Sequence, residues 1–112
     1  MERQIKKFLQ DIVNSISSIN NFTEQTRTFA DYKNNKLVKR AVERELEIIG
    51  EAMKRVLELD PEIKINNPKG AVNFRNRISH GYDTIDDYII WGIITRHLPI
   101  LKKEVELLLQ KK

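Results

Sequence analysis

Residues 75–82 read RNRISHGY and gather the side chains best suited to chemistry in this chain. The stretch holds a permanent cation, an amide, an imidazole and a phenol, in Arg75, Asn76, His80 and Tyr82. Histidine can take or give a proton near neutral pH, and arginine stays charged and binds phosphate. These residue types suit metal-free cleavage of RNA. His80 would act at the ribose 2′-hydroxyl or the leaving oxygen, and Arg75 would clamp the phosphate.

The surroundings of this motif are basic. Between residues 63 and 82 there is no acidic residue, although the whole chain carries a net charge of only +4. We therefore expect Lys69 and Arg77 to bind the RNA backbone. Asn76 would hold the histidine or a phosphate oxygen, and Tyr82 would stack on a base or donate to a phosphate.

The spacing of the motif limits how one helix could use it. Asn76 and His80 are four residues apart, so an α-helix would place them on one stripe. Arg75 and His80 are five apart and would point about 140° away from each other. The two would converge if the helix distorts at Gly81, or if a second copy of the helix lies alongside in a symmetric dimer.

A structural interpretation of the same residues stays open. His80 would then only satisfy the last carbonyls of a helix, and Tyr82 would belong to the core. His97, which precedes Leu98 and Pro99, is interpreted as a surface or capping residue.

Length and composition indicate one domain over residues 1–112. With no cysteine and only two histidines, we expect no disulfide, no metal site and no cofactor. The first residues lack the apolar run of a signal peptide, and the longest apolar run, residues 88–94, is too short to cross a bilayer. We expect a cytoplasmic protein with no membrane contact.

Hydrophobic periodicity predicts an all-α bundle of four to five main helices. Nothing alternates with period two for long enough to form a strand. The expected segments are residues 3–19, 23–30 with Thr23 as cap, 36–59, 67–80, a helix opening at Thr84, and 100–110.

Several details follow from this assignment. Phe22 and Phe29 should pack inward, and Lys39–Glu43 and Glu51–Arg55 should form ion pairs four residues apart. Gly50, inside the longest helix, either permits close approach of another helix or is simply tolerated at the surface. Thr84 and Asp87 resemble a capping box. Leu98–Pro99 should break or kink the last helix.

The motif as a whole resembles the Arg-Asn-x-x-x-His-x-Tyr signature of the HepT-like toxins of the HEPN superfamily. The resemblance covers nearly the whole chain, including LEIIGEA at residues 46–52, the loop DPEI at 60–63 and the segment from Trp91 to Leu101. It implies a homodimeric HEPN-type up-down bundle in which the two motif helices line a shared cleft.

The resemblance also implies a function. The chain would be the metal-independent ribonuclease toxin of a type VII HepT/MntA-like toxin–antitoxin system, acting on tRNA or mRNA. Arg75 and His80 match the catalytic positions, and Asn76 matches the polar residue between them. An MntA-like nucleotidyltransferase antitoxin would inactivate it by AMPylation of Tyr82, which adds a negative phosphodiester beside Arg75 and His80.

Two questions remain open from the sequence. Glu47 and Glu51 match acidic positions of the family without a defined role, and the acids of residues 83–87 either weaken RNA binding or cap the next helix. The alternative function is a non-catalytic HEPN module that presents substrate or nucleotide to a separate nucleotidyltransferase.

Overall fold

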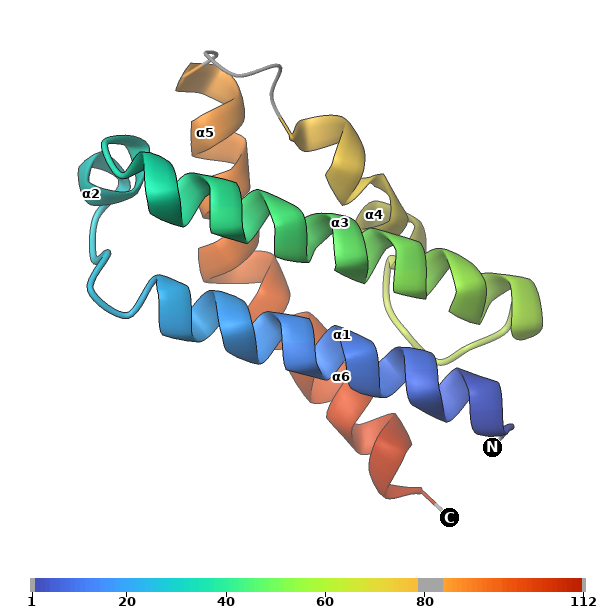
Figure 1. Cartoon of the computed structure of the whole chain (residues 1–112). Coiled ribbons are helices and arrows are strands. Elements are labelled where there is room, and N and C mark those ends of the chain that lie inside the picture. The colour runs from blue at the N-terminus through green and yellow to red at the C-terminus, as the bar shows by residue number, and fades with distance from the viewer. Residues whose placement is uncertain (1, 79–83, 112) are drawn as a thin grey trace.

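The computed structural model describes residues 2–78 and 84–111, which form helices and turns with no strand among them (Figure 1). Helices α1 and α3 lie side by side and run in opposite directions, while α5, η2 and α6 follow one another and cross behind them. The predicted all-helical fold with four to five main helices is confirmed. In chain order the elements are α1 (Arg3–Phe22), α2 (Phe29–Lys33), α3 (Lys36–Leu59), α4 (Pro68–Val72), the 3₁₀ turn η1 (Asn73–Arg77), α5 (Thr84–Gly92), the π turn η2 (Ile93–His97) and α6 (Leu98–Gln110).

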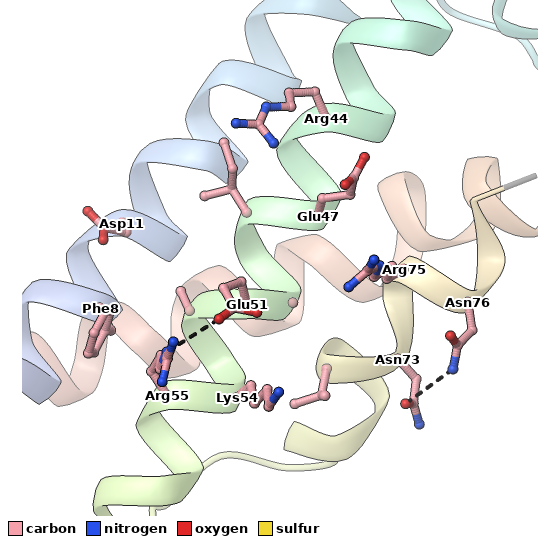
Figure 2. A pocket seen from close by; sticks show the side chains of 14 residues that line it. Phe8, Asp11, Arg44, Glu47, Glu51, Lys54, Arg55, Asn73, Arg75 and Asn76 are labelled. Atoms are coloured by element: carbon pink, nitrogen blue, oxygen red, sulfur yellow. Dashed lines mark hydrogen bonds and ion pairs between the residues drawn. The ribbon is translucent and has the colours of Figure 1, made fainter.

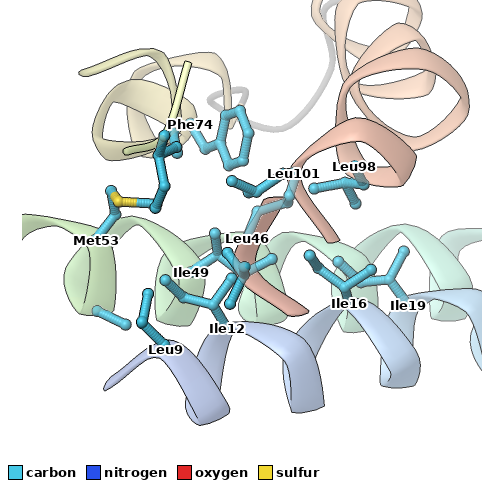
Figure 3. Close-up of a cluster of buried hydrophobic side chains, with 14 of the residues drawn as sticks. Leu9, Ile12, Ile16, Ile19, Leu46, Ile49, Met53, Phe74, Leu98 and Leu101 are labelled. Atoms are coloured by element: carbon cyan, nitrogen blue, oxygen red, sulfur yellow. The ribbon is translucent and has the colours of Figure 1, made fainter. Parts of the chain in front are cut away.

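The core lies between α1, α3 and α6, where aliphatic side chains from each helix meet (Figure 3). Helices α1 and α3 each bury a hydrophobic stripe, and each fully buried Leu or Ile contributes roughly 1.5–3 kcal/mol relative to an exposed one. The buried stripe of α3 consists of Val42, Leu46, Ile49, Met53 and Val56. None of the described helices is both long enough and apolar enough to span a membrane.

The end of α1 lies later than predicted. Asn20 and Asn21 do not stop the helix, which continues to Phe22. The Thr23 hydroxyl donates to the carbonyl of Ile19 at 2.8 Å, and the Thr23 amide donates to the same carbonyl at 3.0 Å. As a result Phe22 is 39% exposed, and the prediction that it packs inward was wrong.

The second helix is also displaced from its predicted position. Because the Thr23 hydroxyl serves α1, Thr28 provides the cap of α2 by accepting a hydrogen bond from the amide of Asp31 at 3.1 Å. The predicted span of 23–30 was therefore wrong. Phe29 is half-buried and sets its ring edge-on to Tyr88, with 5.3 Å between centroids.

Helix α3 has the predicted bounds. Asn35 caps it by accepting from the amide of Val38, and it ends before Asp60–Pro61. The close-approach interpretation of Gly50 is confirmed, since a Cβ there would stand 3.2 Å from the carbonyl oxygen of Val72.

One of the two predicted ion pairs on α3 is present. Arg55 pairs with Glu51 at 3.3 Å, as predicted. Lys39 does not pair with Glu43, because its ammonium reaches Asp87 on α5 while Glu43 pairs with Arg40. A buried partner on another helix thus replaces the local pair.

The helix around Pro99 is irregular but unbroken. Residue 98 donates its amide to the carbonyl of Ile93, five residues back, which makes a π turn ahead of Pro99. The Thr95 hydroxyl also donates to the carbonyl of Trp91 at 2.9 Å. The wider turn leaves room for the proline ring, which has no N–H to donate. The predicted break is absent, since α6 begins at Leu98 directly after the π turn, and the alternative of a kink stays a prediction.

Candidate functional site

The segment that carries the motif begins as predicted and ends differently. Asn67 starts α4 by accepting a hydrogen bond from the amide of Gly70 at 3.1 Å, with a left-handed φ of 55° that asparagine tolerates. The α-helix ends at Val72 and tightens into η1, after which Ile78 is extended. The prediction of one helix through His80 was therefore wrong.

Burial of Phe74 explains this change. Its ring is 2% exposed, while its neighbours Asn73, Arg75 and Asn76 remain exposed. A 3₁₀ turn sets three residues per turn, so one buried side chain can alternate with two exposed ones. Asn76 lies in η1, which ends at Arg77, so no helix continues from Asn76 into residue 78. Residues 79–83, with the predicted sites His80 and Tyr82, lie outside the described residues.

Arg75 and Asn76 stand on the wall of a hollow of about 710 Å³ between α1, α3 and the α4–η1 segment (Figure 2). The hollow has an apolar floor and a mixed polar rim. The floor includes Gly50, Ala52 and Val72, and the rim carries Asp11, Arg44, Glu47, Glu51, Lys54, Arg55, Asn73, Arg75 and Asn76. Arg75, the predicted phosphate-binding cation, thus lines the same hollow as residues of α3.

The side chain of Arg75 is exposed. Among residues 2–78 and 87–111, whose side chains the structure describes, no carboxylate lies within ion-pair distance of it. Asn76 makes only a long contact, from its Nδ2 to Oδ1 of Asn73 at 3.5 Å. A guanidinium in this setting can donate two parallel hydrogen bonds to a phosphate.

The hollow also gives Glu47 and Glu51 a location that the sequence left open. Both line it from α3, and Glu51 is turned toward Arg55 (Figure 2). Glu51 is held by Arg55, which also contacts Glu58 at 3.4 Å. Glu47 is half-buried.

Three of the basic groups on the rim, Arg44, Lys54 and Arg55, were missed by sequence reasoning. Arg44, Glu47, Glu51 and Arg55 are spaced by three or four residues on α3, which forms a polar stripe beside the buried one. That spacing is the signal that could have revealed them.

The other two predicted cations lie apart from this hollow. Lys69 lines a neighbouring hollow of about 400 Å³ that shares Lys54, Val72 and Asn73 with the first. Arg77 is exposed and lines neither of these two hollows. The structure therefore places Arg75 and Asn76 together, Lys69 next to them, and Arg77 outside.

His97 has a different environment from the one predicted. It is half-buried, makes no side-chain capping bond, and sets its ring edge-on to Phe74. Burial lowers the pKa of this imidazole, and the nearby Glu104 carboxylate partly opposes the shift. The interpretation as a surface or capping residue was wrong, because Phe74 draws the ring into a packed contact.

Within the described part of the chain, no three His, Cys, Asp or Glu side chains are grouped so that they could hold a metal ion. The chemistry available at the hollow is that of cations, amides and carboxylates. Together, fold and site define a small all-helical protein with a polar hollow built around an exposed arginine.

Comparison with known sequences identifies the family. The sequence model of the family described as Ribonuclease HepT-like matches residues 10–108, and the chain belongs to this family. The protein MJ1380 of Methanocaldococcus jannaschii, provisionally named an RNase, is 38% identical over 95% of this chain and 97% of its own length. Another protein of that organism, MJ1216, provisionally named in the same way, is 36% identical over 94% of this chain and 87% of its own.

A third relative carries the family name. It is named a probable ribonuclease HepT, comes from Thermococcus cleftensis, and is 34% identical over 95% of this chain and 96% of its own length. No solved structure matches the chain.

Proposed function

We propose that this chain is a metal-independent endoribonuclease and the toxin of a type VII HepT/MntA-like toxin–antitoxin system. Its membership of the HepT-like family and the RNase names of its relatives support this proposal. The observation that carries it is Arg75, an exposed guanidinium on the wall of a hollow large enough for a nucleotide, without a carboxylate partner among residues 2–78 and 87–111.

The proposed reaction needs one cation and two proton transfers. Arg75 binds the scissile phosphate and stabilises the charge that builds on its oxygens. His80 removes the proton of the ribose 2′-hydroxyl, whose oxygen attacks phosphorus. The bond from phosphorus to the 5′-oxygen breaks, and that oxygen takes a proton from His80 of the partner subunit. The products are a 2′,3′-cyclic phosphate and a 5′-hydroxyl.

A homodimer supplies the second imidazole. A single histidine cannot be base and acid at the same moment, so two copies around a shared cleft divide the roles. Asn76 orients the phosphate or the imidazole by a neutral hydrogen bond. Lys69 and Arg77 hold the flanking RNA backbone electrostatically, which steers the substrate without selecting its sequence.

The proposed inactivation of the ribonuclease depends on the same positive charge of Arg75. A nucleotidyltransferase antitoxin of the MntA type transfers AMP from ATP to the hydroxyl of Tyr82 and releases pyrophosphate. The new phosphodiester is anionic and competes with RNA for Arg75.

The test is RNA cleavage by purified protein in EDTA, with Tyr82 first shown by intact mass to be unmodified. Wild type should cut RNA, and Arg75→Ala and His80→Ala should each reduce the rate by about 10²-fold or more at unchanged melting temperature. His97→Gln removes the chain's other histidine, which contacts Phe74 and not the proposed catalytic groups, and it should retain much more activity than His80→Ala. Intact RNA with unmodified wild type would favour the alternative, a non-catalytic HEPN module that presents substrate or nucleotide to a separate nucleotidyltransferase.

A further inference from the structure

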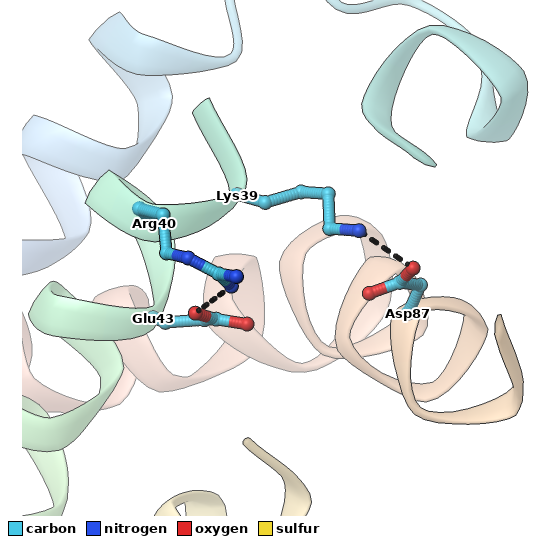
Figure 4. Close-up of polar contacts among 4 residues, drawn as sticks. All are labelled: Lys39, Arg40, Glu43 and Asp87. Atoms are coloured by element: carbon cyan, nitrogen blue, oxygen red, sulfur yellow. Dashed lines mark hydrogen bonds and ion pairs between the residues drawn. The ribbon is translucent and has the colours of Figure 1, made fainter. Parts of the chain in front are cut away.

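A buried ion pair joins the first turns of α3 and α5. The ammonium of Lys39 lies 2.9 Å from Oδ2 of Asp87, and their side chains are 15% and 7% exposed (Figure 4). The two residues are 48 positions apart in sequence. The pair therefore fixes the start of α5 against α3.

This pair differs from the other ion pairs of residues 2–78 and 87–111, the residues whose side chains the structure describes. Each of the others joins residues three or four apart on one helix, and none has both side chains buried. Exposed pairs of that kind contribute a few tenths of a kcal/mol and place no helix against another. Lys39 and Asp87 instead set the position of one helix relative to a second.

The surroundings of the pair have little access to water. Tyr32 packs beside it with a fully buried side chain stacked on Trp91 at 5.5 Å between centroids. Burial raises the pKa of the Tyr32 hydroxyl, the Glu43 and Asp87 carboxylates raise it further, and Arg40 opposes them. Electrostatic contacts are strong in such a setting, so both the length and the direction of the Lys39 contact are restricted.

The pair stands at one end of the motif. Asp87 is seven residues beyond His80 and five beyond Tyr82. At the other end, the carbonyls of Ala71 and Val72 lie against Gly50. Both described ends of the segment that contains residues 79–83 are thus attached to the same helix, α3.

We propose that Lys39 and Asp87 are positioning residues for the chemistry of His80, and that their ion pair sets the geometry of the motif more than it stabilises the fold. This inference rests on the proposed ribonuclease function. Neither side chain is assigned a contact with RNA. Their effect acts through the start of α5, which the chain joins directly to residues 79–83.

Energetics support a role in geometry. Removing two charges from water costs several kcal/mol per ion, and the attraction between them seldom repays more than that cost. A well-packed apolar pair of similar size is commonly as stable or more stable. A buried pair at this place is therefore explained better by the direction that it imposes on α5 than by net stability.

The decisive variant replaces both charges by apolar side chains, Lys39→Met with Asp87→Leu. Its melting temperature should equal or exceed that of wild type, because no charge is left buried alone. Its kcat for RNA cleavage should fall at least about tenfold at nearly unchanged KM, because displaced catalytic groups slow the chemical step. Lys7→Met is the matched control, since Lys7 also pairs at 2.9 Å, with Asp11, but is 68% exposed; it should keep wild-type kcat.

A second measurement does not depend on activity. The chain has two histidines, so the ring resonance of His80 can be assigned by comparison with His80→Gln. In the apolar double variant this resonance should shift, while that of His97 stays in place. A folded double variant with wild-type kcat and an unshifted His80 resonance would overturn the inference.

The outcomes separate this inference from the proposed function. If wild type cuts no RNA, the proposed ribonuclease function is contradicted. The shift of the His80 resonance in the double variant then still tests whether Lys39 and Asp87 position His80. If the double variant does not fold, kcat of Lys39→Gln is measured instead, at a temperature below the melting temperature of that variant. A loss of kcat supports the inference there, and wild-type kcat contradicts it.

Discussion

The imidazole of His97 stands edge-on to the phenyl ring of Phe74, with 5.0 Å between ring centroids and 84° between ring planes. This contact joins the π turn η2 to the 3₁₀ turn η1 that carries Arg75. Turns η1 and η2 thus support each other, and an aromatic pair of this kind contributes about 0.5–1.5 kcal/mol beyond its buried area.

The burial of His97 predicts a pH dependence of stability. Its pKa in the folded protein is lowered, so the unfolded chain binds this proton more readily. The contribution of His97 should be complete above its unfolded pKa of about 6.5 and should decrease as pH falls below that value. Urea unfolding of wild type and His97→Leu between pH 7.5 and 5 measures the difference. A difference in unfolding free energy that is constant with pH would contradict the prediction.

Gly50→Ala tests the close approach of α4 to α3. Alanine should gain about 1 kcal/mol of helix propensity at an unconstrained site. Here its Cβ would stand 3.2 and 3.3 Å from two backbone carbonyl oxygens, which must shift. We expect no net gain in the free energy of unfolding, and a lower RNA-cleavage rate as η1 moves. Ala41→Gly in the same helix calibrates the propensity term. A full gain of about 1 kcal/mol at residue 50 would show that the approach imposes no constraint.

Glu47→Gln tests the electrostatics of the hollow. The carboxylate lines the same hollow as Arg75 and repels phosphate. Removing its charge should tighten RNA binding by about two- to fivefold at low salt, with a smaller effect at high salt, because salt screens the repulsion. Fluorescence anisotropy with labelled RNA on the inactive His80→Ala background measures this. Glu24→Gln, an exposed acid in the turn after α1, is the control for net charge. Equal effects of the two substitutions would count against a local role for Glu47.

Modification should occur at Tyr82 and not at the chain's other two tyrosines. Tyr32 is fully buried and cannot reach an enzyme, whereas Tyr88 is 57% exposed and is the competing acceptor. Co-expression with a cognate nucleotidyltransferase should add AMP to wild type and to Tyr88→Phe but not to Tyr82→Phe, as read by intact mass. An adduct that survives Tyr82→Phe would refute the assignment.

The sequence alone determined the elements whose stability is local or strongly periodic. The stripe on α3, its cap at Asn35 and its stop at Asp60–Pro61 were predictable because period, cap chemistry and proline act over a few residues. The family and the candidate residues Arg75 and Asn76 were also readable, because the motif is contiguous. The functional roles of Arg75, Asn76, His80 and Tyr82 all remain predictions.

Tertiary structure decided the features that depend on distant partners. Lys39 had an acceptable local partner in Glu43, yet it pairs with Asp87, 48 residues away, because packing brings α5 against α3. The motif helix tightens into a 3₁₀ turn because Phe74 must reach the core and meet His97. Neither contact leaves a periodic signal, since each joins residues that only the packed fold brings together.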